Sequence, residues 1–267
     1  MVFREESVLE KVIVIKLGGA TLGNHDTIIE DAVKLQRQGR ALVIVHGGAR
    51  IVTEWLARQG TATRFVRGER VTDGLTLEMV TAVLGGLVNK EIVAAINSLG
   101  GQAVGITGID GNLLQGSLRD KEMGYVARIT RINISLLEAL LKSGYLPVVA
   151  PLSMYAFDRP EDAPLVLNVN GDTVAGEIAA ATRAERLIFL TDVAGICDQS
   201  GGLIAELLAS EAEALLASGM VSGGMIPKVK ACLRAIPQGS VARIIDGRKP
   251  HALFREIEAG GLGTTIR

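Results

Sequence analysis

Runs of consecutive apolar residues alternate with segments of helical spacing along most of this chain. The first two runs cover residues 12–15 (Val-Ile-Val-Ile) and 41–45 (Ala-Leu-Val-Ile-Val), and a pair of glycines follows each of them closely. Runs of this kind are typical of strands that are covered on both faces. Because a helical pattern follows each glycine turn, the chain is expected to build parallel βαβ units.

The same pattern continues to the end of the chain. Further strands are expected over residues 103–106, 145–152, 165–167, 187–191 and 241–245, and helices over residues 26–38, 50–59, 76–99, 134–143 and 173–183. The longest helix contains Gly85 and Gly86. Glycine within a helix costs about 1 kcal/mol relative to alanine, so this pair predicts the close approach of another backbone. We expect that backbone to belong to a second copy in a homodimer.

Composition excludes several classes of protein. The 267 residues are 48% hydrophobic, and 28 Lys and Arg against 29 Asp and Glu give a net charge of −1. Neither nucleic acid nor an anionic membrane surface is therefore an expected partner. Cys197 and Cys232 are far apart, so neither a disulfide framework nor a zinc site is expected, and each should be a free, half-buried thiol. The first residues do not resemble a signal peptide, and we expect no apolar run near membrane-spanning length and a cytoplasmic location.

Candidate chemistry begins with Lys16, which stands at the end of the first strand, one residue before Gly18 and Gly19. Glycines at such a place let backbone N–H groups approach a ligand closely. The alternative is an ordinary strand end with a solvated lysine. A second glycine turn, Gly47-Gly48, follows the next strand.

Two later segments concentrate polar residues at helix N-termini. Asn168, Asn170 and Asp172 precede or begin a helix, and three such residues exceed what capping needs, so two of them should face a site. Lys228 follows Pro227 in the first turn of another helix. A cation there opposes the helix dipole unless an anion is bound, which makes Lys228 a strong candidate for binding one.

Residues 64–72 are expected to form a hairpin that carries three arginines. Arg64 and Arg67 are expected to be solvated, whereas Arg70 is flanked by Val71 and Thr72 and is the better candidate for turning inward. A guanidinium group in that position could fork a carboxylate.

These motifs, in this order, resemble those of the amino acid kinase family. The resemblance runs from about Val12 to Ile266 and rests on Lys16-Leu17-Gly18-Gly19, His46-Gly47-Gly48, Gly68-Glu69-Arg70-Val71-Thr72, Asn168-Val169-Asn170-Gly171-Asp172, Leu190-Thr191-Asp192-Val193-Ala194-Gly195 and Gly223-Gly224-Met225-Ile226-Pro227-Lys228. It implies an α/β fold in which an open, mainly parallel central sheet lies in a three-layer αβα sandwich. It also implies a single domain over residues 1–267, with an acyl-amino-acid lobe over about 1–170 and a nucleotide lobe over about 171–267.

The resemblance also implies roles for individual residues. Lys16, Lys228 and Asp172 would be catalytic, with both lysines on the transferring phosphoryl group and Asp172 orienting them. Gly48, Ala49, Arg70 and Asn168 would bind the substrate. ATP would be held by Gly18, Gly19, Asp192, Val193, Ala194, Gly195, Ile196, Cys197, Met220, Val221, Ser222 and Gly224, with Mg²⁺ bound through the phosphates and no metal site on the protein.

Within the family the motifs are most similar to those of the branch that phosphorylates the side-chain carboxylate of N-acetyl-L-glutamate in arginine biosynthesis. Such a carboxylate is already ionised at neutral pH, so the reaction needs no general base. It needs cations and N–H donors instead, and the backbone of Gly18, Gly19, Gly47 and Gly48 could add such donors. Ala49 departs from the glycine usual there, which bears on the acyl group accepted. The alternatives are a kinase of carrier-bound aminoadipate or glutamate and a non-catalytic amino-acid-binding module.

Overall fold

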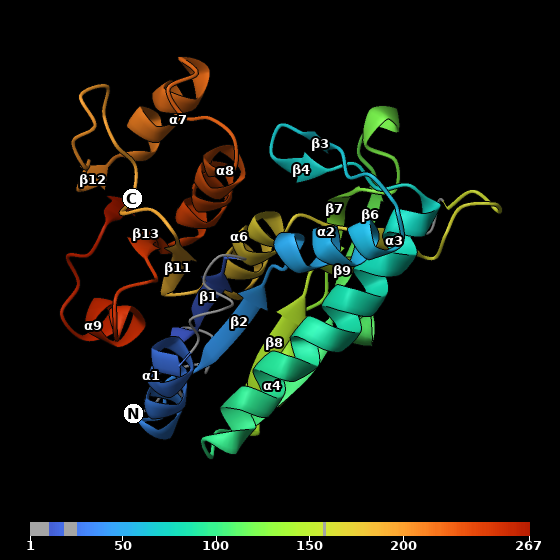
Figure 1. Ribbon diagram of the computed structural model, residues 1–267. Coiled ribbons are helices and arrows are strands. Elements are labelled where there is room, and N and C mark those ends of the chain that lie inside the picture. The colour runs from blue at the N-terminus through green and yellow to red at the C-terminus, as the bar shows by residue number, and fades with distance from the viewer. Residues whose placement is uncertain (1–10, 19–25, 157–158) are drawn as a thin grey trace, which may run out of the picture.

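A central sheet of eight strands organises the structure, a computed structural model that describes residues 11–18, 26–156 and 159–267 (Figure 1). The strand order is β12-β14-β13-β11-β1-β2-β8-β5, and every described pair in it is parallel except β13 with β14. Its strands are β1 (Ile13–Leu17), β2 (Leu42–His46), β5 (Ala103–Thr107), β8 (Leu146–Ala150), β11 (Arg186–Thr191), β12 (Glu206–Leu207), β13 (Val241–Asp246) and β14 (Thr264–Ile266).

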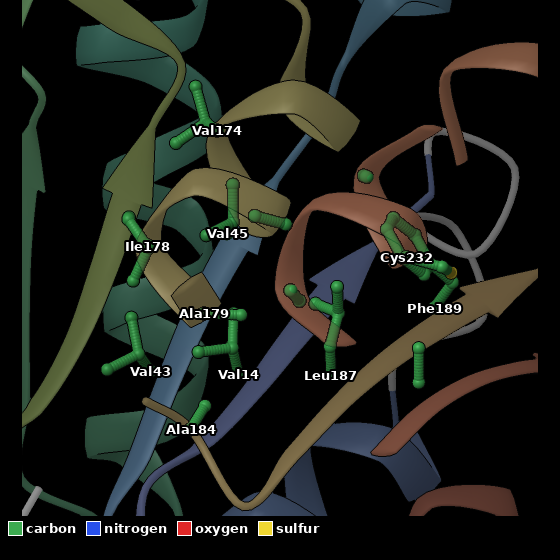
Figure 2. Close-up of a cluster of buried hydrophobic side chains, with 14 of the residues drawn as sticks. Val14, Val43, Val45, Val174, Ile178, Ala179, Ala184, Leu187, Phe189 and Cys232 are labelled. Atoms are coloured by element: carbon green, nitrogen blue, oxygen red, sulfur yellow. The ribbon is translucent and has the colours of Figure 1, made fainter. Parts of the chain in front are cut away.

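Alternation along these strands divides the core into two parts. The helices are α1 (Asp26–Arg37), α2 (Ala49–Arg58), α3 (Gly74–Val80), α4 (Asn89–Ser98), α5 (Ser135–Lys142), α6 (Gly171–Thr182), α7 (Ala209–Ala217), α8 (Met225–Ala235) and α9 (Ala252–Glu258). In β1, Val14 faces a cluster that includes residues of α5, α6, α7 and α8, whereas Ile13 and Ile15 face a cluster that includes residues of α1, α2, the helix over residues 74–98 and α9. Figure 2 shows the first cluster, with Val14, Val43 and Val45 next to side chains of α6. The three-layer αβα fold is therefore confirmed.

A second, four-stranded sheet flanks the first in the order β10-β9-β6-β7. Its strands are β6 (Leu114–Leu118), β7 (Ala127–Ile132), β9 (Leu152–Tyr155) and β10 (Val166–Asn168), and a separate hairpin is formed by β3 (Phe65–Val66) and β4 (Glu69–Arg70). Strand β10 ends at Asn168, three residues before α6 begins, so this sheet delivers Asn168 to the N-terminus of α6. The division into two lobes near residue 170 stays a prediction.

The long helix runs without interruption from Gly74 to Ser98, and its middle, Thr81–Val88, is π-helical. It is long and apolar enough to cross a membrane by length and composition, with a mean hydropathy of 1.6. The expectation that no segment comes near that length is therefore wrong. One face of this helix packs on the sheet, with Val88, Ile92 and Ile96 buried.

The two glycines in this helix differ in their surroundings. A Cβ on Gly85 would lie 3.3 Å from the Leu152 side chain of the same chain, whereas nothing in the described part of the chain lies within 4 Å of one on Gly86. The homodimer stays a prediction. Both cysteines are free thiols, but Cys232 is fully buried and Cys197 is exposed, so the expectation of half-buried thiols is wrong for each.

Candidate active site

A cavity of about 250 Å³ lies at the carboxyl ends of β1 and β2. Among the residues that line it are Lys16, Gly47, Gly48, Ala49, Arg70, Asn168, Asn170, Gly171, Asp172, Gly224 and Lys228. Carboxyl ends of parallel strands are where open α/β sheets bind ligands. The structure thus brings the predicted catalytic and substrate residues together around one space.

Three helices begin at this cavity. The residues at or beside the starts of α2 (Ala49), α6 (Gly171) and α8 (Gly224) line it. A helix N-terminus carries unpaired N–H groups and a partial positive charge of about half a unit. With three of them around one space, the cavity is suited to an anionic ligand.

Lys16 and Lys228 meet on a single carboxylate, although they are far apart in the sequence. Lys16 Nζ lies 2.8 Å from Asp172 Oδ1, and Lys228 Nζ lies 3.0 Å from Asp172 Oδ2. All three side chains are largely buried, with 8%, 16% and 6% of the Lys16, Lys228 and Asp172 side chains exposed. The alternation of β1 explains the first contact, because Lys16 shares the α6 side of the sheet with Val12 and Val14.

The charge of Asp172 is set by its two partners. Burial alone would raise the pKa of this carboxyl, but the Coulomb attraction of Lys16 and Lys228 outweighs burial, and the net direction of the pKa shift is downward. Asp172 is therefore ionised at neutral pH. Two ammonium groups and one carboxylate leave the cluster with a surplus of positive charge.

Two glycines allow the elements to come this close. A Cβ on Gly176 would lie 2.7 Å from Ala231 Cβ and 2.8 Å from Ala231 Cα, so α6 and α8 cross in near backbone contact. The crossing lies one helical turn beyond Asp172 on α6 and one beyond Lys228 on α8. A Cβ on Gly171 would similarly lie 3.2 Å from the His46 carbonyl oxygen and 3.5 Å from Lys16 Cε. Gly171 was known only as part of a motif and Gly176 was not singled out, because a glycine inside or beginning an alanine-rich helix is the only signal that either leaves in the sequence.

Arg70 is held at the N-terminus of α2. Its Nη2 donates to the Ala49 carbonyl oxygen at 2.7 Å and to Thr53 Oγ1 at 2.8 Å, and its guanidinium carbon lies 4.8 Å from the centre of the Phe65 ring. Burial lowers the pKa of this guanidinium. Nη1 is buried, and no hydrogen-bond acceptor reaches it within the described residues. An unpaired guanidinium nitrogen beside a cavity is suited to a carboxylate of a ligand.

The polar residues before α6 divide their tasks. Asn170 Oδ1 accepts from the N–H groups of Asp172 and Thr173 and caps the helix. Asn168 and Asp172 line the cavity without capping, and Asn170 lines it as well as capping, so all three face the cavity where two were expected to. Asn168 Nδ2 donates to Thr72 Oγ1 at 2.9 Å.

The glycine turns supply fewer free donors than the sequence suggested. The Gly18 N–H donates to the Leu190 carbonyl oxygen at 3.1 Å, and the Gly47 N–H donates to that of Leu17 at 3.0 Å. Both bonds extend the sheet, so the proposed use of these two N–H groups as phosphate donors is wrong for this conformation. Gly48 has a φ of 147°, which favours glycine. Gly19 lies outside the described residues.

The His46 side chain forms a hydrogen bond with the backbone of the Gly47-Gly48 turn. It is fully buried, and its Nδ1 lies 2.8 Å from the Gly47 carbonyl oxygen, to which it must donate. Nε2 is then the acceptor for Asn89 Nδ2 at 3.2 Å. Burial lowers the pKa of His46 to about 4, so the ring is neutral at physiological pH.

Most of the predicted nucleotide-binding residues that the structure describes do not line this cavity. Gly224 alone among those described lines it. Asp192, Val193, Ala194 and Cys197 follow β11 and are exposed, as are Met220 and Ser222 before α8, whereas Gly195, Ile196 and Val221 are buried. Ile196 donates its N–H to Thr264 Oγ1 at 2.9 Å and is part of the core. Their roles stay predictions.

Ala49 stands where a glycine is usual in the family, and its backbone conformation shows whether a glycine is required there. It is the first residue of α2 and has no positive φ, so its methyl group causes no strain there. The departure from glycine therefore changes the lining of the cavity and leaves the backbone path unaffected.

Comparison with known proteins places the chain in a family. The model of the amino acid kinase family matches residues 11–246. The chain belongs to the amino acid kinase family. An acetylglutamate kinase of Dehalococcoides mccartyi (strain CBDB1) is 49% identical over 255 residues, which cover 96% of this chain and 94% of that protein. One from Nostoc sp. (strain PCC 7120 / SAG 25.82 / UTEX 2576) is 45% identical over 265 residues, covering 96% and 87%.

A solved structure agrees with these relatives. The protein smu.665 of Streptococcus mutans UA159 superposes with a TM-score of 0.83 at 25% identity, over 96% of this chain and 98% of that one. The predictions of the family, the fold class and a kinase are confirmed.

Proposed function

We propose that this protein transfers the γ-phosphoryl group of ATP to the side-chain carboxylate of N-acetyl-L-glutamate, which yields N-acetyl-L-glutamyl 5-phosphate in arginine biosynthesis. The observation that carries the proposal is the meeting of Lys16 and Lys228 on Asp172 at one wall of a cavity to which Arg70 also contributes. The relatives named acetylglutamate kinase support the choice of acceptor.

The chemistry requires charge compensation. A glutamate side chain has a pKa of about 4.3 and is ionised at neutral pH, so no general base is needed. Its oxygen attacks the γ-phosphorus, the bond from that phosphorus to the β,γ-bridging oxygen breaks, and ADP leaves with the electron pair. Two anions must approach each other, so catalysis depends on positioning and on cations. Lys16 and Lys228 supply the cations, and the N-termini of α6 and α8 add to them.

The acceptor would be held by other residues that line the same cavity. Arg70 Nη1 is free to take its α-carboxylate, and Asn168 also lines the cavity. Ala49 adds one methyl group to that lining. Gly48, whose N–H has no acceptor in the described part of the chain, completes the proposed substrate residues. Gly224 and the residues after β11 and before α8 would hold ATP.

Mg²⁺ would be bound mainly through the phosphates. No group of three or more His, Cys, Asp or Glu side chains suited to a metal ion occurs within the described residues. Mg²⁺ commonly keeps several waters and takes one or two carboxylates, so an ion that arrives with ATP needs no cluster of acidic side chains. When bound, the ion would neutralise part of the phosphate charge. A homodimer and a cytoplasmic location complete the proposal.

The test is a comparison of acceptors. ATP turnover should be rapid with N-acetyl-L-glutamate and slow with glutamate, aspartate and N-acetyl-aminoadipate, and hydroxylamine should trap the acyl phosphate as a hydroxamate. Failure of every free acceptor would exclude the proposal in favour of a carrier-bound substrate. A carrier-bound substrate would need basic residues to contact an acidic carrier protein. Arg67 is exposed at the hairpin turn and could make such a contact, whereas Arg64 donates to the Glu122 carbonyl oxygen.

A pair of lysine variants tests the mechanism. Lys228→Ala should lower kcat by about 100-fold or more, because a cation on the transferring group is lost. Lys230→Ala, on an exposed position of the same helix, should retain wild-type kcat. Circular dichroism should show both variants folded. Equal kcat in the two variants would remove Lys228 from the mechanism.

A further inference from the structure

Thr72 is fully buried and does not line the cavity. It nevertheless contacts Arg70 and Asn168, two of the residues proposed to bind the phosphoryl acceptor. Its hydroxyl donates to the Arg70 carbonyl oxygen at 3.1 Å and accepts from Asn168 Nδ2 at 2.9 Å. A hydroxyl has one hydrogen. Because that hydrogen is committed to Arg70, the hydroxyl can only accept from Asn168.

This arrangement decides which way the Asn168 amide is turned. If the amide were reversed, Oδ1 would face Thr72 and would need its hydrogen, and the Arg70 carbonyl oxygen would lose a partner. A lost partner in a buried site costs about 1–3 kcal/mol. Nδ2 therefore stays on Thr72. Oδ1 accepts no hydrogen bond from the described residues and is the amide atom left for a ligand.

The backbone around Thr72 is equally constrained. The Tyr125 N–H donates to the Thr72 carbonyl oxygen at 2.7 Å, and the Tyr125 carbonyl oxygen accepts from the Asn168 N–H at 3.0 Å. The Thr72 N–H donates to the Met123 carbonyl oxygen at 2.9 Å. A Cβ on Gly124 would lie 2.2 Å from the Thr72 carbonyl oxygen, so this turn fits only glycine. Thr72 and Asn168 are thus held on either side of one backbone segment.

We propose that Thr72 is a positioning residue for the acceptor: its hydroxyl fixes the Asn168 amide so that Oδ1 accepts an N–H of the bound substrate. The inference rests on the proposed function and deepens it, because it assigns a partner to the amide N–H of an N-acylated amino acid. A ligand with an ester oxygen in place of that N–H would set two acceptors against each other.

The experiment compares N-acetyl-L-glutamate with (S)-2-acetoxyglutarate, the analogue in which oxygen replaces the amide N–H. The wild type should prefer the amide by about tenfold in kcat/KM, the value of one buried hydrogen bond. Thr72→Val should raise the KM for N-acetyl-L-glutamate about tenfold, reduce the preference to about threefold or less, and leave the KM for ATP unchanged. Thr72→Ser keeps the hydroxyl and should retain the preference.

Two results would overturn the role of Thr72 while leaving the proposed function intact. One is an undiminished preference of Thr72→Val for the amide over the ester, and the other is an equal increase in the KM of N-acetyl-L-glutamate and of (S)-2-acetoxyglutarate. A wild type that phosphorylates neither acceptor would overturn both. If Thr72→Val does not fold, Thr72→Ala removes the same hydroxyl and is compared with Thr72→Ser. In an Asn168→Ala background, removal of the hydroxyl should have no further effect on the preference.

Discussion

Gly176→Ala should move α8 away from α6 and thereby separate Lys228 from Asp172, the carboxylate that it shares with Lys16. The added Cβ would lie 2.7–2.8 Å from Cβ, Cα and the carbonyl oxygen of Ala231. Since carbon atoms in contact are about 3.5–4.0 Å apart, α8 must retreat by roughly 0.7 Å. Two of these three atoms belong to the backbone, so a change of side-chain rotamer cannot relieve the contact.

The magnitude follows from the ion pair beside the crossing. Lys228 Nζ lies 3.0 Å from Asp172 Oδ2. If the retreat is transmitted one turn along each helix, that distance approaches about 3.7 Å, and at an effective dielectric constant of about 20 the attraction weakens by about 1 kcal/mol. Displacement of a catalytic group by about 1 Å can cost about 100-fold in rate, so kcat should fall by about 5-fold to 100-fold.

Steady-state kinetics and thermal unfolding test this together. Overpacking should lower the free energy of unfolding by about 1–3 kcal/mol, whereas the KM of the acceptor should change little because Arg70 and Asn168 lie away from the crossing. Gly74→Ala is the matched control, since nothing lies within 4 Å of a Cβ there and its φ is not positive. It should keep wild-type kcat. A destabilised Gly176→Ala with unchanged kcat would refute the idea that this crossing sets the position of Lys228.

Two further predictions concern buried groups at the same site. The pKa of His46 is lowered from 6.5 to about 4, so the unfolded chain binds the extra proton, and acidification from pH 7 to pH 5 should cost about 2 kcal/mol of unfolding free energy. Chemical denaturation at several pH values checks this, and His46→Gln should show a shallower dependence. Arg70→Lys removes the planar guanidinium group, which can donate two parallel hydrogen bonds to a carboxylate. The KM of the acceptor should rise about tenfold or more with a smaller change in kcat. An unchanged KM would exclude Arg70 as the partner of the acceptor's carboxylate.

Local pattern was sufficient to predict much of the fold. The first two strands and the turn at Gly47-Gly48 are where the structure has them, and Asn170 caps α6 as its residue type suggests. Lys228 was identified because a cation in the first turn of a helix is unfavourable without an anion, and Lys16 because it ends a buried strand just before a pair of glycines. That is a local energetic conflict, and a local conflict can be read from sequence.

Contacts between distant segments could not be read in this way. Nothing in the sequence near Gly176 states that Ala231 will lie against it, and Thr72 is a β-branched residue that fits any hairpin. The same holds for the Gly18 and Gly47 N–H groups, whose acceptors are Leu190 and Leu17 on neighbouring strands. The sequence showed glycines able to donate, but only strand order shows that these donors are already used.

The use of those donors changes how the site must work. With two glycine N–H groups committed to the sheet, fewer backbone donors face the cavity, so in the proposed reaction compensation of the phosphoryl charge would depend more heavily on Lys16 and Lys228. Without a ligand these two cations would repel each other at close range. Asp172 offers one oxygen to each, so it both cancels one charge and fixes the distance between the two amines. A ligand anion then meets cations already in place, which avoids the reorganisation that freely moving lysines would require.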